Sequence, residues 1–217
     1  YNEITDFMLM ANSSTCDYIL VGGSLINHGK FNIYLKKIHE ISTKSILLFP
    51  GNNQQISPHA DAILLLTLIS GRNPDLLIGQ HVKTAFQLKE SGLEILPCGY
   101  LLIESNQLTS AIYMSESLPI PKNKPDIAAA TALAGTQLGL QYIYLDTGSG
   151  SQNKVNEKII LEVKKNIDVP LIVGGGIIYQ DQLINTWNAG ADLVIIGTSI
   201  EKKYSNMFDF KKQKEWN

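Results

Sequence analysis

Cysteine is scarce in this chain, with only Cys16 and Cys98 among 217 residues. The two are far apart and form no C-x-x-C pattern, so we expect reduced thiols and a cytoplasmic location rather than a disulfide framework. The four histidines, at positions 28, 39, 59 and 81, lack the spacing of metal ligands. Ordinary surface or packing roles are expected for them.

Charge of one sign and long apolar runs are also missing. The formal net charge is -2, without the basic excess that nucleic-acid binding favours. No apolar run approaches the length of a membrane span, and from the polar start YNEITD we expect no signal peptide. What is present is a hydrophobic content of 44%, enough for a sizeable core. Without a linker or a shift in composition, we expect one domain over residues 1–217.

Short apolar segments recur along the chain with amphipathic helical patterns between them. They do not alternate with polar residues, which predicts strands buried on both faces, as in a parallel sheet covered by helices. Asn73, Asn156 and Asp126 are expected helix caps, and Gly92 and Gly190 are expected helix ends. The predicted strands are 18–24, 45–51, 62–68, 94–103, 143–148, 171–176 and 193–198.

This rhythm favours a (β/α)₈ TIM-like barrel over a doubly wound sheet. Seven strands are one short of a closed barrel, and the residues before Tyr18 read as a helix that follows a strand. We therefore expect the first strand to precede this sequence; a seven-stranded open sheet is the alternative. After the strand 94–103, alternation around Asn106 and Gln107 predicts a projecting β-hairpin.

Two successive strands end in glycine, at Gly174–Gly176 and at Gly197. In a parallel barrel these ends share one rim, where the phosphate site of this fold recurs. Glycine lets an anion approach backbone N–H groups, and a short helix after Gly197 would add the positive end of its dipole. Tight turns alone are the competing explanation, but a third glycine-rich end at 146–150 favours phosphate.

The third end also carries polar side chains. Tyr144 and Asp146 are two residues apart on a strand and should point to the same side. A carboxylate does not favourably face a phosphate dianion, so Asp146 is expected to accept hydrogen bonds from neutral hydroxyls of the same ligand, a phosphorylated polyol. Ser24 follows another glycine end and is expected either to contact Mg²⁺ or a diphosphate, or to cap a helix.

Eight stretches together resemble the geranylgeranylglyceryl phosphate synthase family, and specifically its group II bacterial branch. The resemblance covers about residues 17–203, and the motifs stand in the family's order. The matching stretches are VGGSL (21–25), FPGNNQQIS (49–57), ADAILLLTLISGRNPDLLIGQHV (60–82), GYLLI (99–103), PIPKNKPDIAAATALAG (119–135), YLDTGSG (144–150), VGGGI (173–177) and IIGTSIE (195–201).

The resemblance implies a modified TIM barrel that uses Mg²⁺ to transfer a prenyl group from a prenyl diphosphate to sn-glycerol-1-phosphate. It implies a metal role for Ser24, and catalytic roles for Asp146 and Tyr144. It also implies an aspartate and a lysine at the end of the first strand, which is not in this sequence. Carried over by position, the glycerol-phosphate residues are Tyr144, Leu145, Asp146, Thr147, Gly148, Ser149, Gly150, Gly175, Gly176, Gly197 and Thr198.

Two positions depart from the family pattern. Many relatives have glutamate where Asp146 stands, so its contact with the glycerol hydroxyls is altered or water-mediated. Thr198 replaces a common asparagine, and its backbone N–H is expected to bind phosphate all the same. Arg72 is a candidate diphosphate contact, with bracing of its own loop as an equal alternative. An apolar trough for the prenyl tail is expected from Leu65, Leu68, Ile69, Tyr100 and Tyr113, against a plain core role for the leucines.

Two other functions compete with the transferase. One is a different phosphate-binding barrel enzyme, such as an isomerase, an aldolase or a flavin-dependent oxidoreductase. The other is a non-catalytic protein that binds a phosphorylated metabolite. The family resemblance further implies a homo-oligomer, a dimer or hexamer, and at most transient contact with a membrane.

Overall fold

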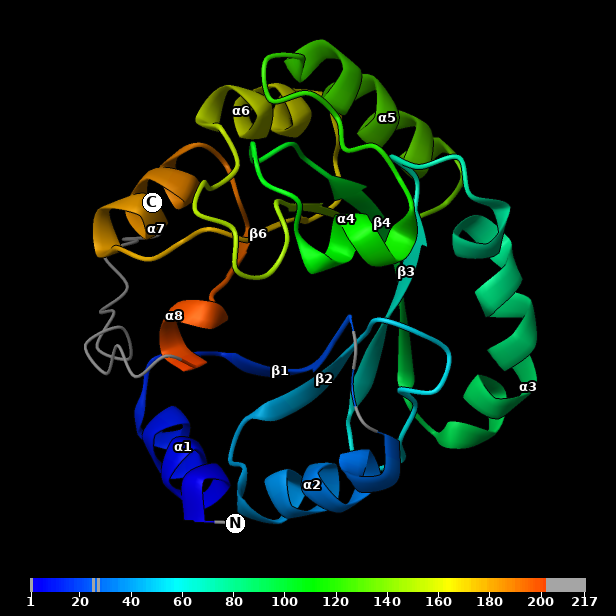
Figure 1. The fold of residues 1–217 in the computed structure, drawn as a ribbon, viewed down its shortest axis with the longest axis vertical. Helices are drawn as coiled ribbons and strands as arrows, with labels where there is room; N and C mark the ends of the chain where they lie inside the picture. The colour runs from blue at the N-terminus through cyan, green and yellow to red at the C-terminus, as the bar shows by residue number, and fades with distance from the viewer. Residues whose placement is uncertain (1, 25, 27, 202–217) are drawn as a thin grey trace.

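The computed structural model describes residues 2–24, 26 and 28–201. Seven strands form one parallel sheet in which each strand pairs with the next along the chain. Figure 1 shows the sheet curling around a centre, as in a β/α barrel, with helices on its outside. The strands are β1 (Tyr18–Gly23), β2 (Ser45–Pro50), β3 (Ala62–Leu68), β4 (Glu94–Leu102), β5 (Tyr142–Asp146), β6 (Leu171–Gly174) and β7 (Leu193–Ile195).

Helices connect the strands, as the sequence predicted. Asn156 caps its helix through a hydrogen bond from the Lys158 N–H, and Gly92 ends another in the left-handed conformation. Asp126 lies in a first turn and not at a cap, which corrects that expectation. The helices are α1 (Asn2–Ser13), α2 (His28–Ile41), the π-helix η1 (Asp75–Gly79), α3 (Gln80–Ser91), α4 (Ser110–Ser115), α5 (Pro125–Gln137), α6 (Glu157–Asn166), α7 (Gln180–Asn188) and α8 (Thr198–Glu201).

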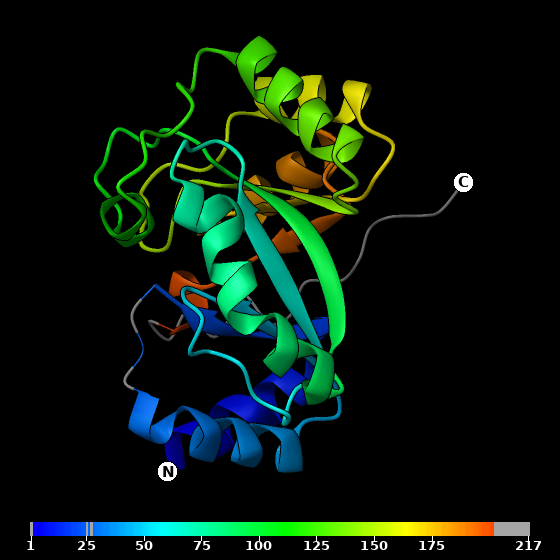
Figure 2. The same cartoon turned by 90° about the vertical axis from the view of Figure 1, so that its right-hand side faces the viewer.

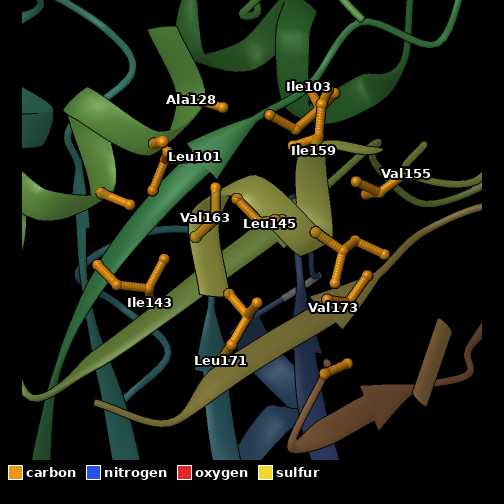
Figure 3. Close-up of a cluster of buried hydrophobic side chains, with 14 of the residues drawn as sticks. Leu101, Ile103, Ala128, Ile143, Leu145, Val155, Ile159, Val163, Leu171 and Val173 are labelled. Atoms are coloured by element: carbon orange, nitrogen blue, oxygen red, sulfur yellow. The ribbon is translucent and has the colours of Figure 1, made fainter. Parts of the chain in front are cut away.

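Both faces of the sheet are buried, which explains the apolar runs without alternation. Alternate residues of the strands point outward into a cluster packed against α5 and α6, including Leu101, Leu145 and Val173 (Figure 3). The residues between them point inward and include Tyr100 and Tyr144. The inward set forms the wall of the functional site.

The predicted barrel class is confirmed in a curled form with seven strands. Among the described residues, β1 and β7 each pair with a single strand, so the sheet is not closed. A strand that precedes Tyr18 and its helix would lie outside this sequence and stays a prediction. No helix in the described part of the chain is long and apolar enough to cross a membrane.

The predicted β-hairpin after β4 is wrong. The chain forms one parallel bridge between Ile103 and Ile120, and residues 110–115 between them form α4. Ala111 and Ile112 pack against the inward cluster, so one face of this short helix is apolar. Over six residues a helical face and a period of two are hard to distinguish. In Figure 2 the segment from β4 to α5, drawn in green, extends to the left of the sheet.

Candidate functional site

A cavity of about 680 Å³ lies at the carboxyl ends of the strands and continues along β1 and β7, between α1 and α7. Parallel strands end at one rim, so residues far apart in sequence gather there. The structure brings together ten predicted site residues in the lining of this cavity: Ser24, Tyr100, Tyr144, Asp146, Ser149, Gly150, Gly175, Gly176, Gly197 and Thr198. We call this the rim cavity.

Three predicted glycerol-phosphate residues do not line the rim cavity. Leu145 points outward and is fully buried in the cluster under α5 and α6 (Figure 3). Thr147 is also fully buried, and its hydroxyl has no hydrogen-bond partner among the described residues. Gly148 contributes its backbone N–H to Asp146 at 2.7 Å. These three residues support the loop after β5 without lining the cavity, so a direct contact between them and a ligand stays a prediction.

Gly175 stands at a position that only glycine fits. Its φ is +81°, in the left-handed region that other residues rarely adopt. A Cβ atom there would lie 2.3 Å from the Thr147 hydroxyl and 2.6 Å from the Asp146 carboxylate. The backbone turn after β6 therefore packs directly on the loop after β5. Tight turning and a bare anion-binding surface are both served by this glycine.

Thr198 connects the two glycine-rich ends. Its hydroxyl lies 3.2 Å from the Ser149 hydroxyl and accepts a hydrogen bond from the Gly150 N–H at 3.0 Å. It is also the first residue of α8, directly after Gly197. Thr198 therefore has a side-chain contact that the sequence did not predict. The loop after β5 and the start of α8 form one continuous wall of the rim cavity.

Asp146 is almost fully buried and holds two hydrogen bonds. The Tyr100 hydroxyl donates to its Oδ2 at 2.5 Å, and the Gly148 N–H donates to its Oδ1 at 2.7 Å. Burial raises the pKa of Asp146, and the two donated bonds act in the opposite direction. Each carboxylate oxygen has a second lone pair that remains able to accept a hydrogen bond from a ligand hydroxyl.

Three aromatic rings form the inner wall beside Asp146. The ring centroids of Phe49 and Tyr100 are 6.1 Å apart, those of Phe49 and Tyr144 5.4 Å, and those of Tyr100 and Tyr144 5.3 Å. Burial raises the pKa values of both tyrosines well above the ordinary value, so both hydroxyls stay protonated and can donate. Sequence reasoning did not single out Phe49, although its place at the end of a buried strand was a usable signal.

A second cavity, of about 150 Å³, adjoins the first. We call it the apolar cavity, because Leu64, Leu65, Leu66 and Leu68 of β3 line it together with Leu76 of η1. The two cavities share part of their lining: Gly23, Ser24, Phe49, Tyr100 and Ala111. The rim therefore opens onto an apolar space beside β3 and α3.

The expected trough residues divide between this cavity and other places. Leu65, Leu68 and Tyr100 line the apolar cavity. Ile69 instead packs against the outward cluster. Tyr113 on α4 is 70% exposed and lines neither cavity. Leu65 and Leu68 belong to different clusters of the sheet, so period-two alternation alone does not predict that both line this cavity.

Arg72 is exposed and lines neither cavity. Its guanidinium donates to the carbonyl of Gly71 at 2.7 Å and to that of Ile69 at 3.4 Å. This is the loop-bracing arrangement that was the alternative to a diphosphate contact. The diphosphate role of Arg72 stays a prediction without geometric support.

Ser24 lies where the two cavities meet, but its surroundings do not form a magnesium site. Within residues 2–24, 26 and 28–201, no group of three or more histidine, cysteine, aspartate or glutamate side chains is placed to hold a metal ion. Magnesium prefers carboxylate, water and phosphate oxygens, and one hydroxyl is a poor match for that preference. The residues described here therefore do not by themselves fit Mg²⁺.

Comparisons with known proteins agree with this geometry. The sequence matches the PcrB family over residues 2–214. It is 49% identical to the geranylgeranylglyceryl phosphate synthase of Spirosoma linguale over 86% of this chain and 75% of the relative. It is 41% identical to the geranylgeranylglyceryl phosphate synthase of Thermococcus gammatolerans, over 96% of this chain and 82% of the relative.

A solved structure is similar across nearly the same length. The crystal structure of (S)-3-O-geranylgeranylglyceryl phosphate synthase from Thermoplasma acidophilum in complex with sn-glycerol-1-phosphate superposes with a TM-score of 0.88. The sequence identity is 29%, and the match covers 94% of this chain and 82% of that one. Sequence and fold thus point to the same group of proteins.

Proposed function

Because the chain belongs to the PcrB family, we propose that it transfers a geranylgeranyl or similar long prenyl group to the C3 hydroxyl of sn-glycerol-1-phosphate. The donor is a prenyl diphosphate, and the products are an ether lipid precursor and diphosphate. The observation that carries the proposal is the junction of two unlike spaces. A glycine-rich rim around Asp146 opens onto a leucine-lined cavity, with Tyr100 in the wall of both.

The rim supports recognition of the glycerol phosphate. Gly175, Gly176 and Gly197 leave the backbone bare on two successive strand ends, and α8 begins at Thr198. Backbone N–H groups and a helix start favour an anion, so the phosphate is assigned here. Asp146 stands on the next strand and is assigned the neutral glycerol hydroxyls. The polar ligand thus spans the loops after β5, β6 and β7.

The apolar cavity supports binding of the prenyl tail. Each methylene group buried against the leucines of β3 contributes about 0.8 kcal/mol. With the tail in this cavity, the diphosphate end of the donor reaches the junction near Ser24. The C1 carbon of the donor then faces the rim, where the acceptor hydroxyl is held close enough to react.

In the proposed transfer, Asp146 acts as the base that accepts the proton of the glycerol C3 hydroxyl. The bond between C1 and the diphosphate oxygen breaks, and its electron pair leaves with the diphosphate. The glycerol C3 oxygen forms the new bond to C1, and its proton passes to the Asp146 carboxylate. Tyr100 holds that carboxylate in place through its 2.5 Å hydrogen bond. The rings of Phe49 and Tyr144 exclude water from the reacting carbon.

A product assay tests the proposal. Purified full-length protein with Mg²⁺ should convert radiolabelled glycerol-1-phosphate to an ether lipid, and should prefer it over glycerol-3-phosphate. Donors of C15 to C35 establish the chain length. Asp146→Ala should lower turnover at least about tenfold, because it removes the base. Product formation at an unchanged rate in that variant would remove the proposed role of Asp146, and no product from any donor would refute the transferase.

Mg²⁺ is part of the proposal on the strength of the family resemblance alone. Ser24 supplies one oxygen, and no group of three or more histidine, cysteine, aspartate or glutamate side chains among the described residues is placed to hold the ion. EDTA should abolish turnover and added Mg²⁺ should restore it. Activity that survives thorough chelation would show that this protein does not need the ion.

Three further expectations remain proposals. These are assembly into a dimer or hexamer, a cytoplasmic location with at most transient membrane contact, and membership of the bacterial group II branch. The comparisons include relatives from both bacteria and archaea. Light scattering of the purified protein measures the assembly directly.

A further inference from the structure

Gln55 is a fully buried polar residue outside the residues assigned so far. It lies in the connection from β2 to β3, next to Ile56, which packs in the core between β2, β3 and α3. Its side-chain oxygen accepts hydrogen bonds from the Gly23 and Gly51 N–H groups, both at 3.2 Å. Its side-chain nitrogen donates to the Gly23 carbonyl at 2.7 Å.

This amide joins the carboxyl ends of two strands. Gly23 is the last residue of β1 and pairs in register with Pro50, the last residue of β2. The ladder between these strands ends there. The Gln55 side chain then forms hydrogen bonds with the backbone of Gly23 on β1 and of Gly51, directly after β2. A buried backbone group left without a partner is costly, so this amide determines how the two strand ends meet.

The packing around the amide is tight enough to transmit its position. A Cβ atom on Gly51 would lie 2.2 Å from the Gly23 carbonyl oxygen and 2.7 Å from the Ser24 Cα. Ser24 therefore rests directly on the backbone of Gly51. Movement of either glycine would move Ser24, which lies where the rim cavity and the apolar cavity meet.

We infer that Gln55 is a positioning residue for the diphosphate end of the prenyl donor, acting through Gly23, Gly51 and Ser24. The inference rests on the proposed function, since it needs a donor whose apolar tail lies along β3. Such a tail places its polar head at the shared lining, which includes Gly23 and Ser24. The glycerol phosphate is held by the loops after β5, β6 and β7, so Gln55 affects one substrate and not the other.

Two substitutions separate this role from plain stability. Gln55→Met keeps the shape of the side chain but loses all three hydrogen bonds. Gln55→Glu accepts bonds as a carboxylate but then faces the Gly23 carbonyl without a donor; when protonated, it regains one donor and one acceptor. Gln54 is exposed in the same loop, so Gln54→Met and Gln54→Glu are matched controls.

Steady-state kinetics with both substrates gives the first test. Gln55→Met should raise KM for the prenyl diphosphate about tenfold, and leave KM for glycerol-1-phosphate within about twofold. For Gln55→Glu, the ratio of its KM for the prenyl diphosphate to the wild-type KM should fall toward one as the pH is lowered, because the protonated side chain regains a donor. Gln54→Glu should show no such trend. Equal changes in both KM values, or a lower melting temperature with unchanged KM values, would reduce Gln55 to a structural residue.

Calorimetric binding of inorganic diphosphate in Mg²⁺ buffer is independent of turnover. Wild-type protein and Gln54→Met should bind it alike, and Gln55→Met about tenfold more weakly. If the wild type makes no ether product, the transferase proposal fails, while this measurement still decides the role of Gln55. Absence of binding to the wild type, or equal binding by all three proteins, would overturn the inference.

Discussion

At the scale of single residues, Asp146 is subject to opposing effects on its charge. Burial disfavours the carboxylate, whereas the donated bonds from Tyr100 and Gly148 favour it. Burial is the larger effect, so the pKa is raised. An elevated pKa suits a group that must accept a proton during the reaction. The same effect makes the ionised residue a cost to the stability of the fold.

Asp146→Asn should therefore change the pH dependence of stability. The carboxyl of the folded protein has a pKa above the roughly 3.9 of the unfolded chain. The stability that Asp146 contributes is present below the unfolded pKa and is lost as the pH rises through the folded pKa. Asparagine does not titrate, so the melting temperature of the variant should gain on the wild type as the pH rises.

The gain corresponds to about 1.4 kcal/mol for each unit by which the pKa is raised. Thermal unfolding of the wild type and of Asp146→Asn, from a pH below the unfolded pKa to a pH above the folded pKa, measures this gain in stability. Asp168→Asn, at an exposed position before β6, is the matched control and should show no comparable gain. A difference for Asp146→Asn that shrinks with rising pH would contradict the raised pKa.

The two glycines at the rim are expected to differ in what an added methyl group does. Gly175→Ala forces a left-handed residue against Thr147 and Asp146, so it should lose about 1–3 kcal/mol of stability. At Gly197 the φ is not left-handed, and a Cβ meets no atom of the described residues within 4 Å. Gly197→Ala should keep the stability of the wild type within about 0.5 kcal/mol.

The substitution Gly197→Ala should change ligand binding and not the stability of the fold. That glycine lines the rim cavity, so a methyl group there keeps a phosphate away from the backbone. Gly197→Ala should weaken glycerol-1-phosphate binding about tenfold, which calorimetry measures. Unchanged affinity would show that the phosphate lies elsewhere on the rim.

At the scale of elements, the strands were predictable and the segments between them less so. Apolar runs such as 62–68 and 171–176 predicted buried strands, and period-two alternation placed Tyr144 and Asp146 on one face. The residues after β4 are too few to distinguish a helical face from alternation, so α4 was mistaken for part of a hairpin. The Tyr100–Asp146 hydrogen bond joins residues 46 apart, and no local pattern indicates such a pair.

Element η1 offers a way to test the apolar cavity. Leu76 lines that cavity, while its neighbour Leu77 does not. In Leu76→Trp the larger side chain should occupy part of the 150 Å³ space and shorten the prenyl chain that fits. The ratio of kcat/KM for a C15 donor to that for a C20 donor should rise at least about fivefold.

Leu77→Trp is the matched control, because it makes the same substitution at a neighbouring position that does not line the apolar cavity. Its ratio for the two donors should stay near the wild-type value, and thermal unfolding shows whether either variant has lost its fold. Should Leu76→Trp accept C15 and C20 donors in the wild-type ratio, the tail would have to lie outside the apolar cavity.

At the scale of the whole molecule, the rim is assembled by chain order. Parallel pairing of neighbours from β1 to β7 brings the ends of all strands to one side, so motifs more than 100 residues apart, such as Ser24 and Thr198, line a single cavity. This placement was predictable once the barrel was recognised. Sequence reasoning did not find Phe49 or Gln55. The position of Phe49 at the end of a buried strand was a usable signal, whereas the role of Gln55 depends on three-dimensional packing.

A ligand held by the loops after β5, β6 and β7 should stabilise the whole fold. Binding to the folded state alone adds about 2.7 kcal/mol at a ligand concentration of 100 times Kd. For a chain of this size, that raises the melting temperature by roughly 5–10 °C. Glycerol-1-phosphate should produce this rise in thermal unfolding, and glycerol-3-phosphate a smaller one, because its hydroxyls approach Asp146 with the opposite hand.

Gly197→Ala makes the measurement specific to the rim. This variant should keep the unliganded melting temperature of the wild type, but its tenfold weaker binding reduces the gain by about 1.4 kcal/mol at the same ligand concentration. Equal stabilisation of the two proteins would locate the ligand away from Gly197. Equal stabilisation of the wild type by both enantiomers would show that the site reads the phosphate alone, and that Asp146 does not contact the glycerol.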